Sequence, residues 1–273
     1  MNQKVGEYSI GLQANRDIIF NDYSQIKQIF NDLYKLNFPE LVSIASKKAI
    51  DNMEEYLTVF LAKITPNDKD RIQNNLGTPN GQYIINDSIK NAARYGNTID
   101  LSMLADSVIS SLKNNGDIFC QLYQSASEVI PKLGKNQMQL ILTHFYIHSL
   151  SFKISTVNEL EIYTMKIFSN FSEFTKISNL EREYLSSIGI FSANPIFNDT
   201  GISFMNRKYN PEMNKIIKEY YDDKKIPTVR SVIEYYDMNQ LVKYIMTPIG
   251  KVISLLMIKK EIPDITEDLI RNA

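Results

Sequence analysis

Residues 100–134 read DLSMLADSVISSLKNNGDIFCQLYQSASEVIPKLG, and this stretch decides the fold class. Its apolar side chains recur every three or four residues, which is the period of an amphipathic helix. Gly116 divides the stretch into two helices, because glycine readily adopts the left-handed conformation that ends a helix. Asp100 and Asp117 each precede a helix as its N-terminal cap, and Gly134 follows the end of the second. The stretch therefore predicts consecutive, capped α-helices.

The same helical period continues on both sides of this stretch. Thr65-Pro66 is a start signal, a capping hydroxyl followed by proline at the first helical position, whereas Thr78–Gly81 is typical of a turn. Residues 178–181, SNLE, form a capping box. Helices are expected over 22–33, 39–64, 82–95, 100–115, 118–130, 136–150, 156–174 and 179–188, and further ones start at Asn210-Pro211 and Thr247-Pro248.

Short strands are expected near the two ends of the chain. Residues 5–20 carry apolar side chains on both sides of a polar turn, which predicts strands. Residues 190–192 and 241–246 also favour strand. The predicted fold is mainly α, a multi-helix body with a short N-terminal β element and a small C-terminal sheet. The expected parts are an N-terminal strand segment at 1–20, a helical domain at 21–134 and a second helical domain at 135–273.

Composition excludes several classes of function. A chain of 273 residues with 44% hydrophobic and 22% charged residues can bury a substantial core and is not typical of disorder. Its formal net charge of −1 argues against a general polyanion binder, which neutralises phosphates with an excess of basic residues. The single cysteine, Cys120, excludes an intramolecular disulfide and a multi-cysteine zinc site.

No membrane insertion is expected. The most apolar stretch, 241–258, contains Lys243, Pro248, Gly250 and Lys251, and lysines inside the hydrocarbon of a bilayer are costly. A buried strand and helix is the better interpretation of this stretch. The first residues carry no apolar run of signal-peptide length. A cytoplasmic, reducing location is therefore expected.

The two histidines of the chain, His144 and His148, lie four residues apart. In a helix this spacing places both imidazoles on one face, where the ligands of a metal or a catalytic pair would lie. However, two ligands cannot complete a tetrahedral zinc site, and the glutamate of a zinc-protease helix is missing between them. We therefore interpret them as partly buried polar residues, each hydrogen-bonded to a neighbour.

The remaining candidates also favour structural roles. Cys120 has no basic residue within 118–123 to activate a thiolate and is expected in the core. The pairs Tyr220-Tyr221 and Tyr235-Tyr236 could stack on bases or anchor an interface, but one core and one edge residue in each pair is the simpler expectation. Phosphate-binding and nucleophile-elbow motifs are missing from the sequence. We therefore assign no catalytic, cofactor-binding or metal-binding residue, and no cofactor.

Two segments resemble parts of a winged-helix domain. Residues 184–190, YLSSIGI, resemble the end of its third helix and its first wing strand, and 244–251, YIMTPIGK, resemble its last wing strand and the following helix. About 50 residues separate the two, so the wing would hold an insertion. Such a domain implies DNA binding, but the helix that would enter the major groove, 179–188, has a net charge of −1 and would be repelled by phosphates.

The whole chain resembles a group of uncharacterised helical bacterial proteins related to Abi-alpha-type abortive-infection proteins. The resemblance rests on 11–18 (GLQANRDI), the helix 101–112 with its final SSL, 126–140 with VIPKL, and TPIG at 247–250. It implies a bacterial protein with a role in phage defence and supplies no catalytic residue. The sequence favours a non-enzymatic interaction or effector protein that self-associates through its N-terminal strand segment. A winged-helix nucleic-acid-binding regulator and an enzyme without a recognisable motif remain the alternatives.

Overall fold

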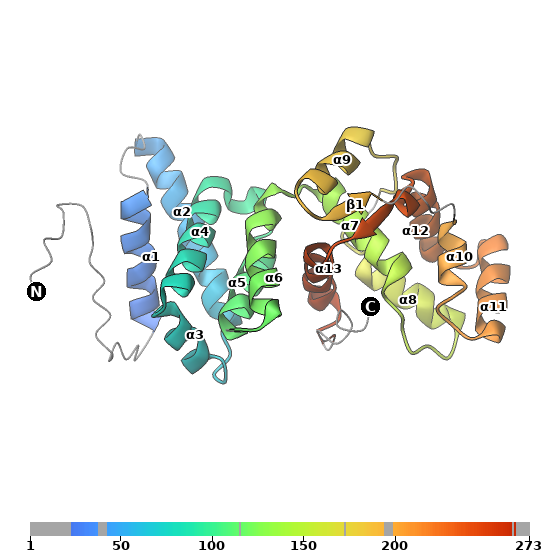
Figure 1. The fold of residues 1–273 in the computed structure, drawn as a ribbon, viewed down its shortest axis with the longest axis horizontal. Coiled ribbons are helices and arrows are strands. Elements are labelled where there is room, and N and C mark those ends of the chain that lie inside the picture. The colour runs from blue at the N-terminus through green and yellow to red at the C-terminus, as the bar shows by residue number, and fades with distance from the viewer. Residues whose placement is uncertain are drawn as a thin grey trace, which may run out of the picture. The chain divides into compact units, whose positions relative to one another are not determined.

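The computed structural model describes residues 23–37, 43–114, 116–171, 173–193, 199–263 and 265. Helices dominate these residues (Figure 1), so the mainly α prediction is confirmed. The α-helices are α1 (Tyr23–Asn37), α2 (Ser43–Lys63), α3 (Lys69–Leu76), α4 (Pro79–Tyr95), α5 (Leu101–Lys113), α6 (Ile118–Val129), α7 (Lys135–His148), α8 (Val157–Ile167), α9 (Asn179–Ser187), α10 (Gly201–Met205), α11 (Pro211–Asp222), α12 (Pro227–Met238) and α13 (Pro248–Glu261). The strands are β1 (Phe191–Ala193) and β2 (Tyr244–Met246).

The chain divides into two compact units, one that ends at Gly116 and one that begins at Asp117. The sequence placed this boundary later, at 134/135. The difference is α6, which packs against α13 and therefore belongs to the second unit. The predicted N-terminal strands at 5–20 lie outside the described residues and stay a prediction.

The first unit is built around α2, which packs against α1, α4 and α5. Phe30, Tyr56 and Phe60 are fully buried at its centre, with ring centroids 5.9 to 6.0 Å apart. Gly96 ends α4 with a φ of +52°, and a Cβ there would lie 2.4 Å from Oδ1 of Asn52. This position therefore requires glycine, as the predicted helix end at Gly96 implies.

The two threonine–proline signals of the first unit have exchanged roles. Thr78-Pro79, predicted as a turn, starts α4, and the Thr78 hydroxyl accepts a hydrogen bond of 3.1 Å from the backbone N–H of Gly81. Thr65-Pro66, predicted as a start, precedes a turn, and α3 begins only at Lys69. Both positions carry a capping hydroxyl followed by proline, so this local signal does not distinguish which of them begins a helix in the folded chain.

The second unit places α7 at its centre, against α10, α12 and α13. The strands pair antiparallel, with Phe191 opposite Met246 and Ala193 opposite Tyr244. The prediction for 241–246 is thus correct only for its second half, because 241–243 form a 3₁₀ turn. The predicted helix at 156–174 ends already at Ile167, and α12 was not predicted.

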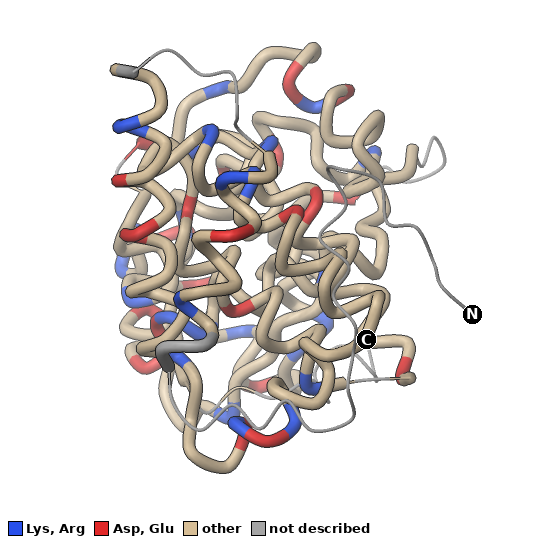
Figure 2. Tube along the Cα trace, turned by 90° about the vertical axis from the view of Figure 1, so that its left-hand side faces the viewer, with Lys and Arg blue, Asp and Glu red and all other residues tan. Residues whose placement is uncertain are grey.

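The apolar stretch 241–258 is a turn, a strand and the greater part of α13. Leu241, Val252, Ile253 and Leu255 are fully buried in the second unit. Among the described residues, no helix is both long enough and apolar enough to cross a membrane. Lysine and arginine positions are interspersed with aspartate and glutamate positions along the helices (Figure 2), as the near-zero net charge implies.

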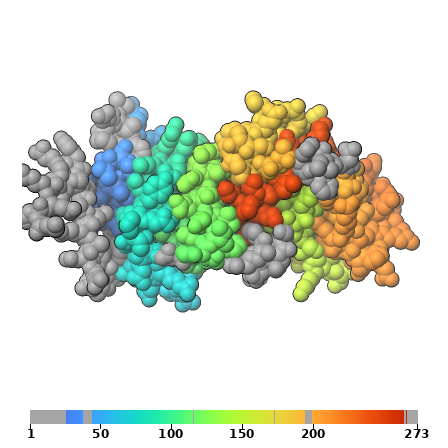
Figure 3. Space-filling view, in the orientation of Figure 1, coloured from blue at the N-terminus to red at the C-terminus, as the bar shows by residue number. Residues whose placement is uncertain are grey.

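In the space-filling view of the second unit, the gold atoms of the α9 region and the red atoms of β2 and α13 are exposed next to one another (Figure 3). This adjacency follows from the pairing of β1, which comes soon after α9, with β2, which directly precedes α13. Two segments more than 50 residues apart in the sequence thereby share one surface. Their pairing agrees with the strands expected at 190–192 and 241–246 in the part 244–246 that forms β2.

Candidate functional site

The histidines are brought together as their helical spacing predicts. His144 and His148 lie on α7 with their rings stacked, the centroids 4.3 Å apart and the planes 16° from parallel. His144 is buried and His148 is half-buried. Their position is the centre of the second unit, where α7 meets α10, α12 and β2.

Each imidazole is hydrogen-bonded to a different element. The Nε2–H of His144 donates to the backbone carbonyl of Tyr244 in β2 over 2.9 Å. Nε2 of His148 lies 2.7 Å from the hydroxyl of Tyr236 in α12. Phe191 and Phe204 pack against the two rings, with centroids 5.2 Å from His144 and 4.2 Å from His148. The two histidines therefore join α7 to β2 and to α12.

A lysine completes this cluster from the connection that follows α10. Nζ of Lys208 donates to the backbone carbonyls of Tyr146 and Leu150, the latter over 2.8 Å. The carbonyl of Tyr146 lies in the last turn of α7 and that of Leu150 just beyond the helix end, where a helix leaves acceptors without intrahelical partners and favours positive charge. Lys208 thus caps α7 from a distant segment, and no sequence pattern signals this role.

The electrostatics of the cluster favour neutral imidazoles. Burial lowers the pKa of His144 to about 4, although its hydrogen bond to Tyr244 acts in the opposite direction. Burial also lowers the pKa of His148 to about 2, and the neighbouring His144 and Lys208 contribute. Burial lowers the pKa of Lys208 to about 7. Both histidines are therefore neutral at pH 7 and unsuited to proton transfer near neutrality.

Among the described residues, no group of metal ligands is found at the histidine pair. Two nitrogens that bind one zinc ion must converge on a point about 2.0–2.1 Å from each. Here the Nε2 atoms of His144 and His148 are engaged by different partners. Within the part of the chain that the structure describes, no three His, Cys, Asp or Glu side chains form a group that could hold a metal ion. The hydrogen bonds of the histidine cluster hold α7 against β2 and α12.

The other sequence candidates are placed in the core or its margin. Cys120 is buried in α6. Tyr235 and Tyr236 are both fully buried, so the expectation of one core and one edge residue is wrong for this pair. The reason is that α12 is covered on two sides, with Tyr235 against Phe174 and Tyr236 against His148. Tyr220 and Tyr221 are both half-buried, each beneath a basic side chain.

Arg182, which entered the sequence analysis only through the net charge of 179–188, is buried and orients α9. Arg182 donates to the backbone carbonyl of Ile177 over 2.9 Å and lies 3.4 Å from Oδ1 of Asn239. Asn239 in turn accepts from the N–H of Ile177 over 2.7 Å and donates to the carbonyl of Tyr235. Because buried polar groups need such partners, this network fixes which face of α9 points inward.

The outward face of α9 is apolar and acidic. Leu180 is 75% exposed and Tyr184 37% exposed, and Glu183 is exposed beside them. The only basic residue of the helix, Arg182, is buried. The net charge of −1 counted from the sequence thus understates the acidity of this face.

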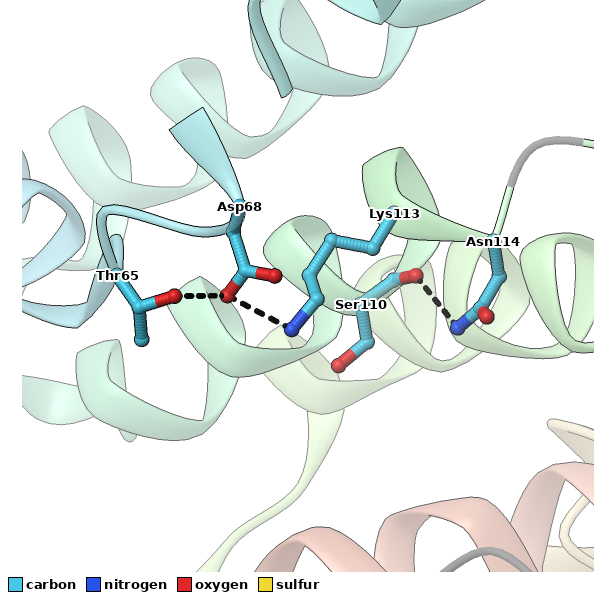
Figure 4. Close-up of polar contacts among 5 residues, drawn as sticks. All are labelled: Thr65, Asp68, Ser110, Lys113 and Asn114. Carbon is cyan, nitrogen blue, oxygen red and sulfur yellow. Dashed lines mark hydrogen bonds and ion pairs between the residues drawn. The ribbon is translucent and has the colours of Figure 1, made fainter. Parts of the chain in front are cut away.

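In the first unit, Figure 4 shows polar contacts at the start of α3 and at the end of α5, one of which joins the two helices. Oδ2 of Asp68 accepts from the hydroxyl of Thr65 over 2.6 Å and from Nζ of Lys113 over 2.9 Å. Burial alone would raise the pKa of Asp68, but the hydrogen bonds from Thr65 and Lys113 hold it below its ordinary value. The contact joins two helices.

Comparison with known proteins gives one match. A family model with the description ":-like" matches residues 21–223, well over half of the chain. The chain belongs to this family. No curated protein and no solved structure matches it. The description of the family names no activity, so the likeness to abortive-infection proteins and to winged helices stays a prediction.

Proposed function

We propose that this protein acts by binding other protein chains, copies of itself included, and not by catalysis or by binding nucleic acid. One observation carries the proposal: α9 turns its only basic residue inward and presents Leu180, Glu183 and Tyr184 outward. A helix that enters the major groove needs basic and hydrogen-bonding side chains on its outer face. Exposed leucine and tyrosine beside a carboxylate suit a protein surface instead.

The histidine cluster supports the non-enzymatic part of this proposal. His144 and His148 are neutral at pH 7, are engaged in hydrogen bonds and join elements of one unit. A general base needs a pKa near the working pH and a reachable substrate proton. Lys208, with its pKa of about 7, meets the first condition, but its Nζ is engaged by the backbone carbonyls of Tyr146 and Leu150. The resemblance to Abi-alpha-type proteins supports a defence role for the interaction.

The proposal is tested on the purified full-length chain by two measurements. Multi-angle light scattering gives the mass across a concentration series, and fluorescence anisotropy with a labelled duplex gives DNA affinity at several salt concentrations. We expect an assembly larger than one chain and DNA binding no tighter than that of a protein of similar charge. A monomer at every concentration, or tight DNA binding that weakens steeply with salt, would contradict the proposal.

Two further measurements test the N-terminal segment and the defence role. Removal of residues 1–20 is expected to lower the mass of the assembly, because an apolar strand segment can pair with a second copy. A bacterial strain that expresses the protein is expected to show fewer phage plaques than a strain with an empty vector. Equal plaque counts across a panel of phages would remove the defence role.

A further inference from the structure

Three large apolar side chains are exposed on adjoining elements of the second unit. Leu180 and Tyr184 lie one turn apart on α9 and so share a face of the helix. Ile245, 52% exposed, lies on the solvent side of β2, opposite the exposed Ser192 of β1. In Figure 3 the gold atoms of the α9 and β1 region border the red atoms of β2 and α13.

Charges of both signs border these side chains. Glu183 is exposed next to Tyr184. The Tyr184 hydroxyl donates to the backbone carbonyl of Lys132 over 3.3 Å, which places this exposed lysine at the margin of α9. We name the set of Leu180, Glu183, Tyr184, Ile245 and Lys132 the α9 surface. It combines an apolar centre with exposed charges of both signs.

We propose that the α9 surface is a two-fold interface between two copies of this chain. In a two-fold interface the same patch lies on both sides, so each patch must complement itself in charge. The α9 surface meets this condition, since Glu183 of one copy can face Lys132 of the other. A nucleic acid would require an excess of positive charge, and a strongly basic partner an excess of negative charge. The inference rests on the proposed function and names the surface through which it operates.

Apolar anchors are expected to carry the affinity of such an interface. Tyrosine is enriched among the residues that dominate binding energy, and buried leucine adds area without a polar group to satisfy. The two-fold axis presents each anchor twice. A single substitution therefore changes the interface at two places, and its effect on dimer affinity is doubled.

The test compares substitutions on the surface with a matched substitution elsewhere in the second unit. Leu180→Asp is placed in the first turn of α9, where a carboxylate favours the helix, so the fold is expected to persist. The control is Ile162→Asp on α8, whose side chain is 63% exposed and lies outside the α9 surface. Light scattering and sedimentation velocity are expected to show at least tenfold weaker dimerisation for Leu180→Asp and Tyr184→Ser, with the control unchanged.

Substitutions that reverse the charges of Lys132 and Glu183 distinguish a second copy of the chain from other partners. Lys132→Glu and Glu183→Lys are each expected to weaken dimerisation when alone. Mixed in equal amounts, the two variants are expected to recover a dimer, because each then offers the charges that the other lacks. This recovery does not occur if the substitutions act only on the fold of one chain.

The failures of the two proposals can be told apart. If the wild-type chain assembles but Leu180→Asp and Tyr184→Ser leave its mass and affinity unchanged, the interface is not the α9 surface, and the proposed function stands. If the wild-type chain is monomeric at every concentration, both proposals fall. If the mixed charge variants stay monomeric while each single variant is folded by circular dichroism, the two-fold arrangement is wrong.

Discussion

Acid is expected to destabilise the second unit through its histidine pair. A histidine whose pKa is lower in the folded chain binds fewer protons when folded, so acid favours the unfolded chain. The contribution of such a histidine to the free energy of unfolding is fully present above the unfolded pKa of about 6.5. It is lost as the pH falls towards the pKa in the folded chain. For His144, with a folded pKa of about 4, this window runs from about pH 6.5 to pH 4.

The magnitude follows from the same relation. Each pH unit below about 6.5 lowers the free energy of unfolding by about 1.4 kcal/mol for one such group. His144 alone therefore lowers it by about 2 kcal/mol at about pH 5. His148 lowers the free energy of unfolding further, but by less than His144 does. The reasons are that His148 is partly exposed and that two neighbouring imidazolium groups repel each other. We expect the second unit to lose about 2–4 kcal/mol between pH 7 and pH 5.

The assay is hydrogen exchange at several pH values, corrected for the intrinsic rates, with peptides from α7 and α12 compared with peptides from α2. The variant His144→Gln/His148→Gln is the control, because glutamine offers hydrogen-bonding groups in place of the ring nitrogens and does not titrate. Its α7 and α12 peptides are expected to keep their protection at pH 5. Equal acid sensitivity of the wild type and this variant would refute the reasoning, and so would a loss of protection confined to α2.

Three further changes are expected to alter the free energy of unfolding, measured by urea titration. Glu161→Gln should cost about 1–2 kcal/mol, because the Glu161 carboxylate accepts from two N–H groups at the start of α12, over 2.7 and 3.0 Å. Gly81→Ala should cost about 1–3 kcal/mol although alanine has the higher helix propensity, since a Cβ added there would lie 1.9 Å from the backbone oxygen of Asn75. Asp68→Asn should cost less than about 1 kcal/mol, because its partner Lys113 is partly exposed. A stabilising Gly81→Ala or a neutral Glu161→Gln would contradict the corresponding contact.

The parts of the fold that depend on local signals could be predicted from the sequence. The capping box at 178–181 opens α9 as expected, with the Ser178 hydroxyl accepting from the N–H of Glu181. Gly96 ends α4, and Asp100 caps α5 through the N–H of Met103. Each of these contacts joins residues within one helical turn, so the sequence contains both partners side by side.

The parts that depend on distant partners could not be predicted. The helix α12 begins at Pro227 without a side-chain cap of its own, and its cap is Glu161, from α8. The C-terminus of α7 is capped by Lys208, 58 residues after Leu150. The compact units divide at 116/117 and not at the predicted 134/135 for the same reason, since α6 is grouped by its packing on α13.

The surface of α9 shows why a count of charges along a helix can mislead. Counted along 179–188, one arginine offsets one of the two glutamates, and the remaining charge alone argued against DNA. In the folded chain Arg182 is buried and donates to a backbone carbonyl and to Asn239, so its N–H groups are not presented on the outer face. The side chains that α9 itself exposes include leucine, tyrosine and a carboxylate. The argument against phosphate binding therefore becomes stronger, and the same inward turn of Arg182 places Leu180 and Tyr184 where a second chain can reach them.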